Sequence, residues 1–313
     1  MLARGWQGLA RHKWAGFRMG SAGEGRDGPA NAGTRLLLAA AFFGAAFAID
    51  LRTNRQFSPV LGSAAIYESA LALFPAIRPG LIATTAHGGI WAGFNVARAF
   101  ADDTGLRIVD VRLVSNFERW LFGGRLPSSM LQNHFFDPTL IQPRDVALGL
   151  VHASFFVVPH GIAALTWFRR RDVYVRYQMA TASCFSLSLA AFIVLPAAPP
   201  WMSDPDRVTR ITHRIVTQAI AGTGSGRSAG PGEAFWFEPN AVAAMPSVHV
   251  AAAVLVFLAL GSLSRRGRGI GALYALAMSV AVVYLGEHFV LDVVAGWLVA
   301  LVAWRLARGL AAS

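Results

Sequence analysis

The chain has 313 residues, of which 55% are hydrophobic and only 14% are charged, and its mean hydropathy is +0.47. Soluble domains carry about 25% charged residues, so the composition excludes an ordinary water-soluble globular protein. The apolar runs are continuous and do not alternate, which disfavours a membrane β-barrel. We therefore expect an all-α protein, a polytopic membrane helical bundle.

The formal net charge is +11, and almost all of the positive charge comes from arginine. These arginines stand at the ends of apolar runs and form no stripe with aromatic residues. Membrane topology and anionic lipid headgroups explain them better than nucleic acid does. The single cysteine, Cys184, lies inside an apolar run, which excludes an internal disulfide and a cysteine-rich metal site.

The first quarter of the chain predicts two segments that precede the main bundle. Residues 1–34 are rich in Gly, Ala and Arg and have no periodicity, which predicts a basic, disordered tail. Residues 35–78 predict a membrane anchor or an interfacial segment. Within them, Leu36–Leu51 is a short span, and residues 59–77 are moderately apolar but contain Glu68.

Apolar runs and breaks then alternate through residues 79–313. Leu81–Phe100 is a candidate span, and Asn116–Phe122 in the polar and aromatic stretch after it predicts an interfacial amphipathic helix. In the long loop 199–245, the cluster Phe235–Phe237 is either a lid or an interfacial anchor. The stronger predicted spans are Val146–Phe168, Tyr174–Leu195, Ser247–Leu263, Ile270–Leu285 and Phe289–Ala307.

Alternation of these spans predicts the topology. It places three basic stretches on one side of the membrane: Arg169–Arg171, Arg265–Arg268, and Arg305 with Arg308. Cytoplasmic loops carry an excess of Lys and Arg, so we expect that side to be cytoplasmic. The loop 199–245 and the insert Gly286–His288 then share the extracytoplasmic side of the cell membrane.

The polar insert between the last two apolar runs carries the first chemical signal. His288 and Asp292 are four residues apart, so they share one face if the last run is helical from its start. A carboxylate on the same face can hold one ring nitrogen protonated and leave the other as a nucleophile or base. Taken alone, the pair also fits a polar cap on a membrane helix.

A second signal stands before the run 247–263. Pro246 suits the first turn of a helix, so Ser247 and Val248 are expected to present free N–H groups, with the Ser247 hydroxyl, as a site for phosphate. His249 then lies one turn into the helix, on the same membrane side as His288. Two histidines, a carboxylate and an anion-binding helix start are the groups that phosphoryl transfer through a histidine needs.

These residues resemble the type 2 phosphatidic acid phosphatase superfamily. Its second signature is similar to Pro246–His249, and its third is similar to His288-x-x-x-Asp292 followed by Gly296. Further residues are similar to bacterial proteins of the inositol phosphorylceramide synthase type, an inositolphosphotransferase branch: Ala198-Pro199-Pro200-Trp201 and Tyr284–His288.

The resemblance covers about residues 80–308 and implies a catalytic domain over residues 79–313. That domain would have a six-helix core, with one or two helices before it. His288 would attack phosphorus, Asp292 would orient it, and His249 would protonate the departing oxygen. Ser247 and Val248 would help to hold the phosphate.

The chain departs from the family pattern in its cations. The first signature, a lysine followed after a gap by Arg-Pro, has no counterpart, and Val282 stands where the third signature usually has an arginine. Arg207, Arg210 and Arg214 in the long loop are candidates to replace them, although each also suits solvent or a headgroup. His152 is a candidate supporting residue, with packing as the alternative.

The favoured function is a membrane phosphatase or phosphotransferase on a lipid-linked phosphate, with no cofactor or metal. Water as acceptor makes it a phosphatase, whereas a polyol such as inositol makes it a transferase. The resemblance also implies that the group transferred could be a phospho-polyol, an inositol phosphate group. A metal-dependent hydrolase would instead use His249, Glu287, His288 and Asp292 as ligands. A non-enzymatic transporter is the third candidate, although transporters place ionisable groups near the midplane.

Overall fold

The computed structural model describes residues 78–99, 101, 112–222 and 242–312, with scattered positions between residues 34 and 74. Residues 1–33 of the predicted tail, Phe235–Phe237 and most of the predicted segment 35–78 lie outside the described residues. The chain divides into two compact units, Met1–Ala83 with Ser313, and Thr84–Ala312. Both histidine motifs belong to the second unit.

The described part of the second unit is all-helical, as predicted, with one isolated bridge between Ala197 and Ala243. The unit boundary falls within α4, whose residues from Thr84 onward belong to the second unit. The described helices are α4 (Arg78–Ala99), α5 (Leu113–Leu121), α6 (Pro127–Phe135), α7 (Pro143–Ala153), the 3₁₀ turn η1 (Ser154–Phe156), α8 (Val158–Arg169), α9 (Arg171–Val194), α10 (Pro200–Ser203), α11 (Ile211–Gly222), α12 (Val248–Leu263), α13 (Arg265–Tyr284) and α14 (Val290–Ala312).

Among the described helices, three are long and apolar enough to cross a membrane: α9, α13 and the part of α14 from Val290 to Arg308. A fourth span results if the bent pair Pro143–Phe156 and α8 is counted as one. The protein is therefore a multi-pass membrane protein. Helix α12 is apolar but has only 16 residues.

The predicted span over Val146–Phe168 corresponds to two helical pieces, because that run bends by 52° between η1 and α8. The Ser154 hydroxyl donates to the Val151 carbonyl at 2.5 Å in this region. Pro159, which has no N–H, stands in the first turn of α8. The apolar length of a segment does not indicate a bend within it, so hydropathy could not predict this break.

Other boundaries also differ from the prediction. Helix α13 begins at Arg265, not Ile270, because the Ser264 side chain accepts from the N–H of Gly267 at 2.9 Å and caps the helix. The region 199–245 was predicted as a loop, but it contains α10 and α11. The predicted amphipathic helix near Asn116–Phe122 is present as α5, and its exposed face carries Phe117 and Trp120.

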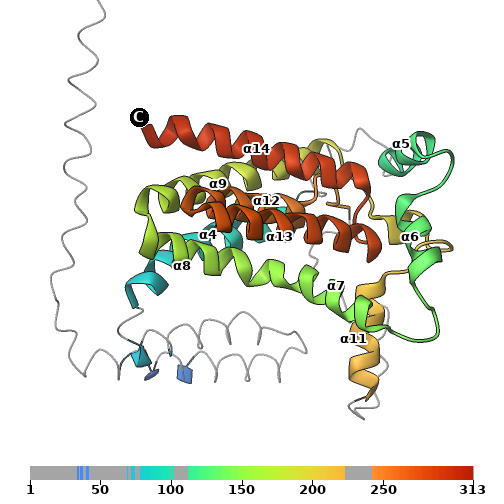
Figure 1. Ribbon diagram of the computed structural model, residues 1–313, viewed down its shortest axis with the longest axis horizontal. Helices are drawn as coiled ribbons and strands as arrows, with labels where there is room; N and C mark the ends of the chain where they lie inside the picture. The colour runs from blue at the N-terminus through green and yellow to red at the C-terminus, as the bar shows by residue number, and fades with distance from the viewer. Residues whose placement is uncertain are drawn as a thin grey trace, which may run out of the picture. The chain divides into compact units, whose positions relative to one another are not determined.

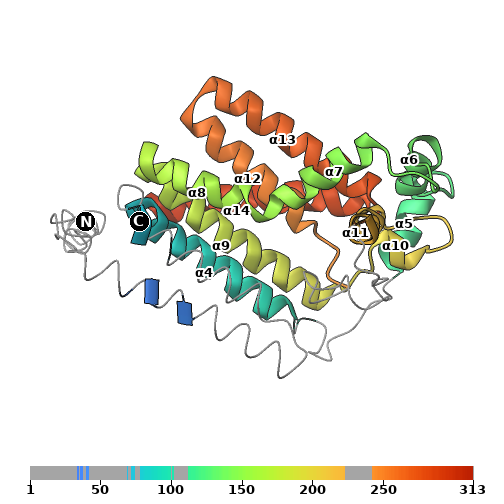
Figure 2. The same ribbon diagram turned by 90° about the horizontal axis from the view of Figure 1, so that it is seen from below.

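Helix α12 lies in the middle of the unit and contacts α8, α9, α13 and α14. Residues from Val250 to Val256 are all buried. Helix α13 approaches closely at Gly271, where an added Cβ would lie 2.6 Å from the Cα of Phe257. Helix α4 runs beside α9 (Figure 2), so its last turn lies near the end of α9.

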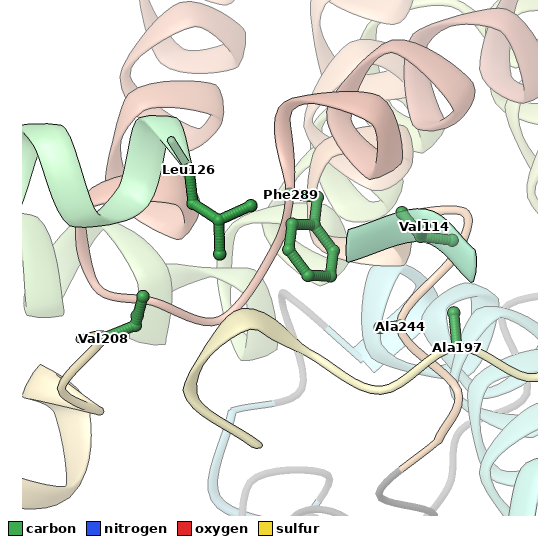
Figure 3. Close-up of a cluster of buried hydrophobic side chains, with 6 residues drawn as sticks. All are labelled: Val114, Leu126, Ala197, Val208, Ala244 and Phe289. Carbon is green, nitrogen blue, oxygen red and sulfur yellow. The ribbon is translucent and has the colours of Figure 1, made fainter. Parts of the chain in front are cut away.

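The short helices α5, α6, α10 and α11 gather at the end of the bundle where α13 passes into α14 (Figures 1 and 2). The α8–α9 junction, the α12–α13 junction and the end of α14 lie toward the opposite end in both views. At the first end, a buried apolar cluster surrounds Phe289 (Figure 3), made of Val114, Leu126, Ala197, Val208, Ala244 and Phe289.

Candidate active site

The two predicted histidines meet at this end of the bundle. Nδ1 of His249 lies 3.3 Å from Nε2 of His288, and Nδ1 of His288 lies 3.3 Å from Oδ2 of Asp292. Asp292 is fully buried and His288 is nearly so. Because the carboxylate faces Nδ1, that nitrogen holds the ring proton, and the lone pair of Nε2 points toward His249.

The turn between α13 and α14 fixes His288. Gly286 has φ +81, and a Cβ there would lie 2.7 Å from the Thr209 carbonyl oxygen, so the position needs glycine. The N–H groups of Glu287 and His288 both donate to the Val282 carbonyl, at 3.0 and 3.1 Å. Phe289, the next residue, is buried in the cluster of Figure 3. The nucleophile candidate therefore stands on a rigid turn.

The start of α12 differs from the prediction. The helix begins at Val248, and Ser247 is its N-cap, with its side chain accepting from the N–H of Val250 at 3.4 Å. The N–H of Ser247 donates to the backbone carbonyl of Asp292 at 3.0 Å. Ser247 is fully buried. Its N–H joins α12 to α14 and its hydroxyl caps α12, so neither group faces the loop. Val248 keeps an N–H without an intrahelical acceptor.

Gly296 explains how α14 comes so close to this cap. A Cβ on Gly296 would lie 2.6 Å from the Ser247 carbonyl oxygen and 3.4 Å from the N of Ala251. Real Cβ atoms do not approach backbone oxygen so closely. The glycine four residues after Asp292 therefore permits the contact between α12 and α14 that places the two histidines together.

A pocket opens beside the histidine pair. Its charged and polar lining consists of Arg98, His249, Glu287 and His288, and the rest is apolar apart from the Val248 backbone. The complete lining is Arg98, Phe155, Phe192, Pro199, Ala243, Ala244, Val248, His249, Glu287 and His288. Distant parts of the chain supply it: the end of α4, η1, the segment from the end of α9 to Pro199, the segment from Ala243 to His249 and the α13–α14 turn.

Comparison with protein-family models matches residues 114–306 to the PAP2 superfamily. The chain belongs to the PAP2 superfamily. Its fold is that of the membrane-type phosphatases of this family, whose members are typically phosphatases or lipid phosphotransferases. Comparisons with curated proteins and with solved structures give no match.

The PAP2 match begins at residue 114, so α4 and its Arg98 lie outside it. Arg98 was missed by the sequence analysis, although a usable signal was present. Alternation of the predicted spans places the end of Leu81–Phe100 on the same side as the loop 199–245. A basic residue four positions after Phe94 in that span could have been considered for the site.

Of the three loop arginines, only Arg210 lies beside the pocket. Its Nε pairs with Oε1 of Glu287 at 3.0 Å, and its guanidinium carbon lies 4.6 Å from the centre of the Trp201 ring. The hydroxyl of Thr212 also donates to Oε1 of Glu287. This pair is largely buried, with side-chain exposures of 15% for Arg210 and 3% for Glu287.

Arg207 and Arg214 are not brought to the histidines. Arg207 lines a separate pocket that also contains Arg119 and Asp204. Arg214 donates to the carbonyl oxygen of Pro138 at 2.6 Å, and its guanidinium lies over the Phe136 ring. Arg207 and Arg214 therefore lie among other residues at the rim of the bundle and not beside the histidine pair.

His152 lies against the proton-donor candidate. Its ring stacks on that of His249 with centroids 4.4 Å apart and planes 30° apart, and Phe155 contacts the same ring at 4.2 Å. These two rings form one wall behind His249. His152 is not among the residues that line the pocket, which gives it a supporting position.

Two residues that the sequence analysis did not select, Glu118 and Gln132, hold the turn that carries His288. Oε2 of Glu118 on α5 accepts the N–H of Leu291 at 3.0 Å, at the start of α14. Burial raises the pKa of Glu118 to about 7. Gln132 on α6 donates to the carbonyls of Thr209 and Tyr284, both at 2.8 Å. Short helices before the main spans thus brace the residues on either side of His288.

The residues that the structure describes give no support to the alternative of a metal site. Within residues 112–222, 242–312 and the described part of α4, no group of three or more His, Cys, Asp or Glu side chains could hold a metal ion. Glu287, which that hypothesis needs as a ligand, is instead bound by Arg210 and Thr212.

Proposed function

We propose that this PAP2 protein is a phosphatase or phosphotransferase that acts on a lipid-linked phosphate through a phosphohistidine intermediate. The observation that carries the proposal is the line of groups from His249 through His288 to Asp292. A neutral imidazole with one nitrogen tied to a carboxylate is an activated nucleophile at its other nitrogen. A second imidazole within 3.3 Å of that nitrogen is placed for proton transfer at the same centre.

In the first step, the Nε2 lone pair of His288 attacks phosphorus and the P–N bond forms. The P–O bond to the leaving group breaks, and the departing oxygen takes the Nδ1 proton of His249. That ring enters the step as an imidazolium, stabilised by the bound phosphate anion, and leaves it neutral. The Nδ1–H of His288 remains bonded to Asp292, which balances the positive charge on the phosphorylated ring. Substrate binding must displace the direct contact between the two rings, since the phosphoryl group occupies the position between them.

In the second step, an acceptor oxygen attacks phosphorus and the P–N bond breaks. His249, now neutral, takes the proton of the acceptor, and His288 returns to its starting state. Water as acceptor releases phosphate, whereas a hydroxyl of a polyol such as inositol yields a new phosphodiester or phosphomonoester. The similarity of Tyr284–His288 to inositol phosphorylceramide synthase-like proteins favours transfer to a polyol.

The site is proposed to face the extracytoplasmic side of the cell membrane. Arg169 and Arg171 lie at the α8–α9 junction, and Arg265 and Arg266 begin α13. The 16 residues of α12 separate His249 from Arg265 by roughly 24 Å along the helix axis. With these arginines in the cytoplasm, the histidines are at the outer surface.

The decisive experiment incubates the purified full chain in lipid vesicles with a panel of labelled lipid phosphates, with and without polyol acceptors. Release of labelled phosphate identifies a phosphatase, and label in the polyol identifies a transferase. Acid quenching loses a P–N bond, so the protein is also quenched in base and examined for bound label. We expect base-stable label on the parent and on His249→Ala, and none on His288→Ala.

The variants His288→Ala and Asp292→Asn should lower turnover by at least about 10³-fold and about 10²-fold. Size-exclusion elution checks that each still folds. Turnover of His288→Ala at the parent rate would reject the phosphohistidine mechanism.

A further inference from the structure

The last turn of α4 is held firmly against the bundle by a stripe of large side chains. His87, Trp91, Phe94 and Arg98 are spaced by four, three and four residues, so they share one helix face. The first three are buried. Phe94 stacks on Phe185 of α9 with ring centroids 4.3 Å apart. Arg98 continues this inward-facing stripe at the end that reaches the pocket.

Trp91 and Phe94 also connect α4 to the walls of that pocket. The Trp91 ring lies 4.6 Å from Phe155, and the Phe94 ring lies 6.3 Å from Phe192. Phe155 and Phe192 are both lining residues of the pocket that contains Arg98, His249 and His288. The aromatic contacts of Trp91 and Phe94 therefore fix the last turn of α4, which carries Arg98, beside the pocket.

A phosphate in this pocket needs positive charge that the PAP2 signatures do not supply here. Val282 replaces the arginine of the third signature and is fully buried, and its carbonyl is used by the turn. Arg207 and Arg214 lie elsewhere. Arg210 is shared with the carboxylate of Glu287, so that pair brings little net charge to the pocket.

We propose that the guanidinium of Arg98 binds the phosphoryl oxygens of the substrate, so that α4, a helix outside the matched PAP2 region, completes the active site. This inference rests on the proposed function for its substrate class, a phosphate ester. A planar guanidinium donates to two phosphate oxygens at once. The mainly apolar walls keep the local dielectric low, which strengthens the charge interaction as negative charge spreads over the phosphoryl oxygens.

Binding of inorganic phosphate tests the site separately from turnover. The full chain in vesicles is titrated with inorganic phosphate, and bound phosphate is followed by phosphorus NMR in the His288→Ala background, which removes the nucleophile. Arg98→Gln should weaken phosphate binding by at least tenfold, and Arg98→Lys by less. No phosphate binding in the Arg98-containing protein, or equal binding after Arg98→Gln, overturns the inference.

Turnover provides the second test. With the lipid phosphate found to be active, Arg98→Ala should lower kcat/KM by about 10²-fold to 10³-fold, and added methylguanidinium should restore part of it. Rescue by a free guanidinium is not expected of a residue that only supports packing. A fall in kcat/KM that methylguanidinium leaves unchanged, in protein that elutes normally, contradicts the inference.

Arg266→Gln is the matched control, because Arg266 is an exposed arginine in the first turn of α13, at the far end of α12 from His249. It should leave phosphate binding and turnover within twofold of the parent. If no lipid phosphate is turned over but phosphate binding depends on Arg98, the proposed function fails and the anion site stands. If turnover proceeds and ignores Arg98, only the anion site fails.

Discussion

The backbone N–H of Ser247 donates to the backbone carbonyl of Asp292 at 3.0 Å. One main-chain hydrogen bond thus joins the cap of the helix that carries His249 to the first turn of the helix that carries Asp292. The bond fixes the position of α12 along α14 between residues 45 positions apart in the sequence, and it involves backbone atoms only. The relative position of the two histidines depends on this contact between α12 and α14.

Gly296→Ala should disrupt that contact. The new Cβ would lie 2.6 Å from the Ser247 carbonyl oxygen, and a backbone atom cannot move aside cheaply, so α14 must shift. We expect a loss of about 1–3 kcal/mol in the free energy of unfolding and at least a tenfold loss of turnover. Gly269→Ala in α13, where nothing lies within 4 Å, is the control. Full turnover of Gly296→Ala would contradict the prediction, because it would show that activity does not depend on the close contact between α12 and α14.

The buried pair Arg210–Glu287 should couple strongly. Removing one partner leaves the other charge in a largely buried site, so Arg210→Met or Glu287→Gln alone should destabilise by about 3–5 kcal/mol. The double variant should recover part of this loss in an unfolding titration. The exposed pair Arg170–Asp172, with exposures of 55% and 66%, should couple far more weakly, because solvent screens its charges. Equal coupling in the two cycles would contradict the role of burial.

Glu118 should make stability depend on pH. Burial raises its pKa from 4.5 to about 7, so the folded state retains a proton that the unfolded state has already lost. Stability should therefore fall as pH rises from about 4.5 to about 7, by at most about 1.4 kcal/mol per pH unit from this group, and level off above. Thermal unfolding of Glu118→Gln in detergent should lack this component. An unchanged slope in that variant would assign the pH dependence to other groups.

His152 should act through its ring and not through its nitrogens. It stacks on His249 at 4.4 Å and does not line the pocket, so His152→Phe, which keeps a ring there, should retain turnover within about threefold. His152→Ala removes the wall behind His249 and should lower turnover about tenfold, or about 1.4 kcal/mol. If Phe and Ala variants lose turnover equally, a polar role for His152 is required instead.

The spacing of residues within one motif predicted that His288 and Asp292 contact each other, and the structure confirms this contact. His288 and Asp292 are four residues apart and in contact, but α14 begins only at Val290, so the turn before the helix, and not helix geometry alone, places His288 beside the carboxylate. The apolar runs predicted an all-helical membrane protein, because continuous stretches without alternation fit only helices in a bilayer. Family membership followed from the same short motifs.

Contacts between distant segments could not be predicted in this way. Ser247 was expected to hold phosphate, but its N–H is used by Asp292. The run 146–168 was predicted as a span from its apolar length, and its 52° bend was not predicted. Glu118 and Gln132 lie more than 150 positions before the atoms of α13 and α14 that they bind, and no periodicity in the sequence indicates such a partner.

The sequence by itself determined the helical class, the four-residue pairing of His288 with Asp292, and the likeness to one superfamily, since these depend on local spacing and on the apolar length of each run. Only the tertiary structure decided that His249 reaches His288 and that Arg98, not Arg207 or Arg214, lines their pocket. The physical reason is that helix faces are set by neighbours along the chain, whereas the partners of those faces are set by close packing at positions such as Gly296 and Phe94.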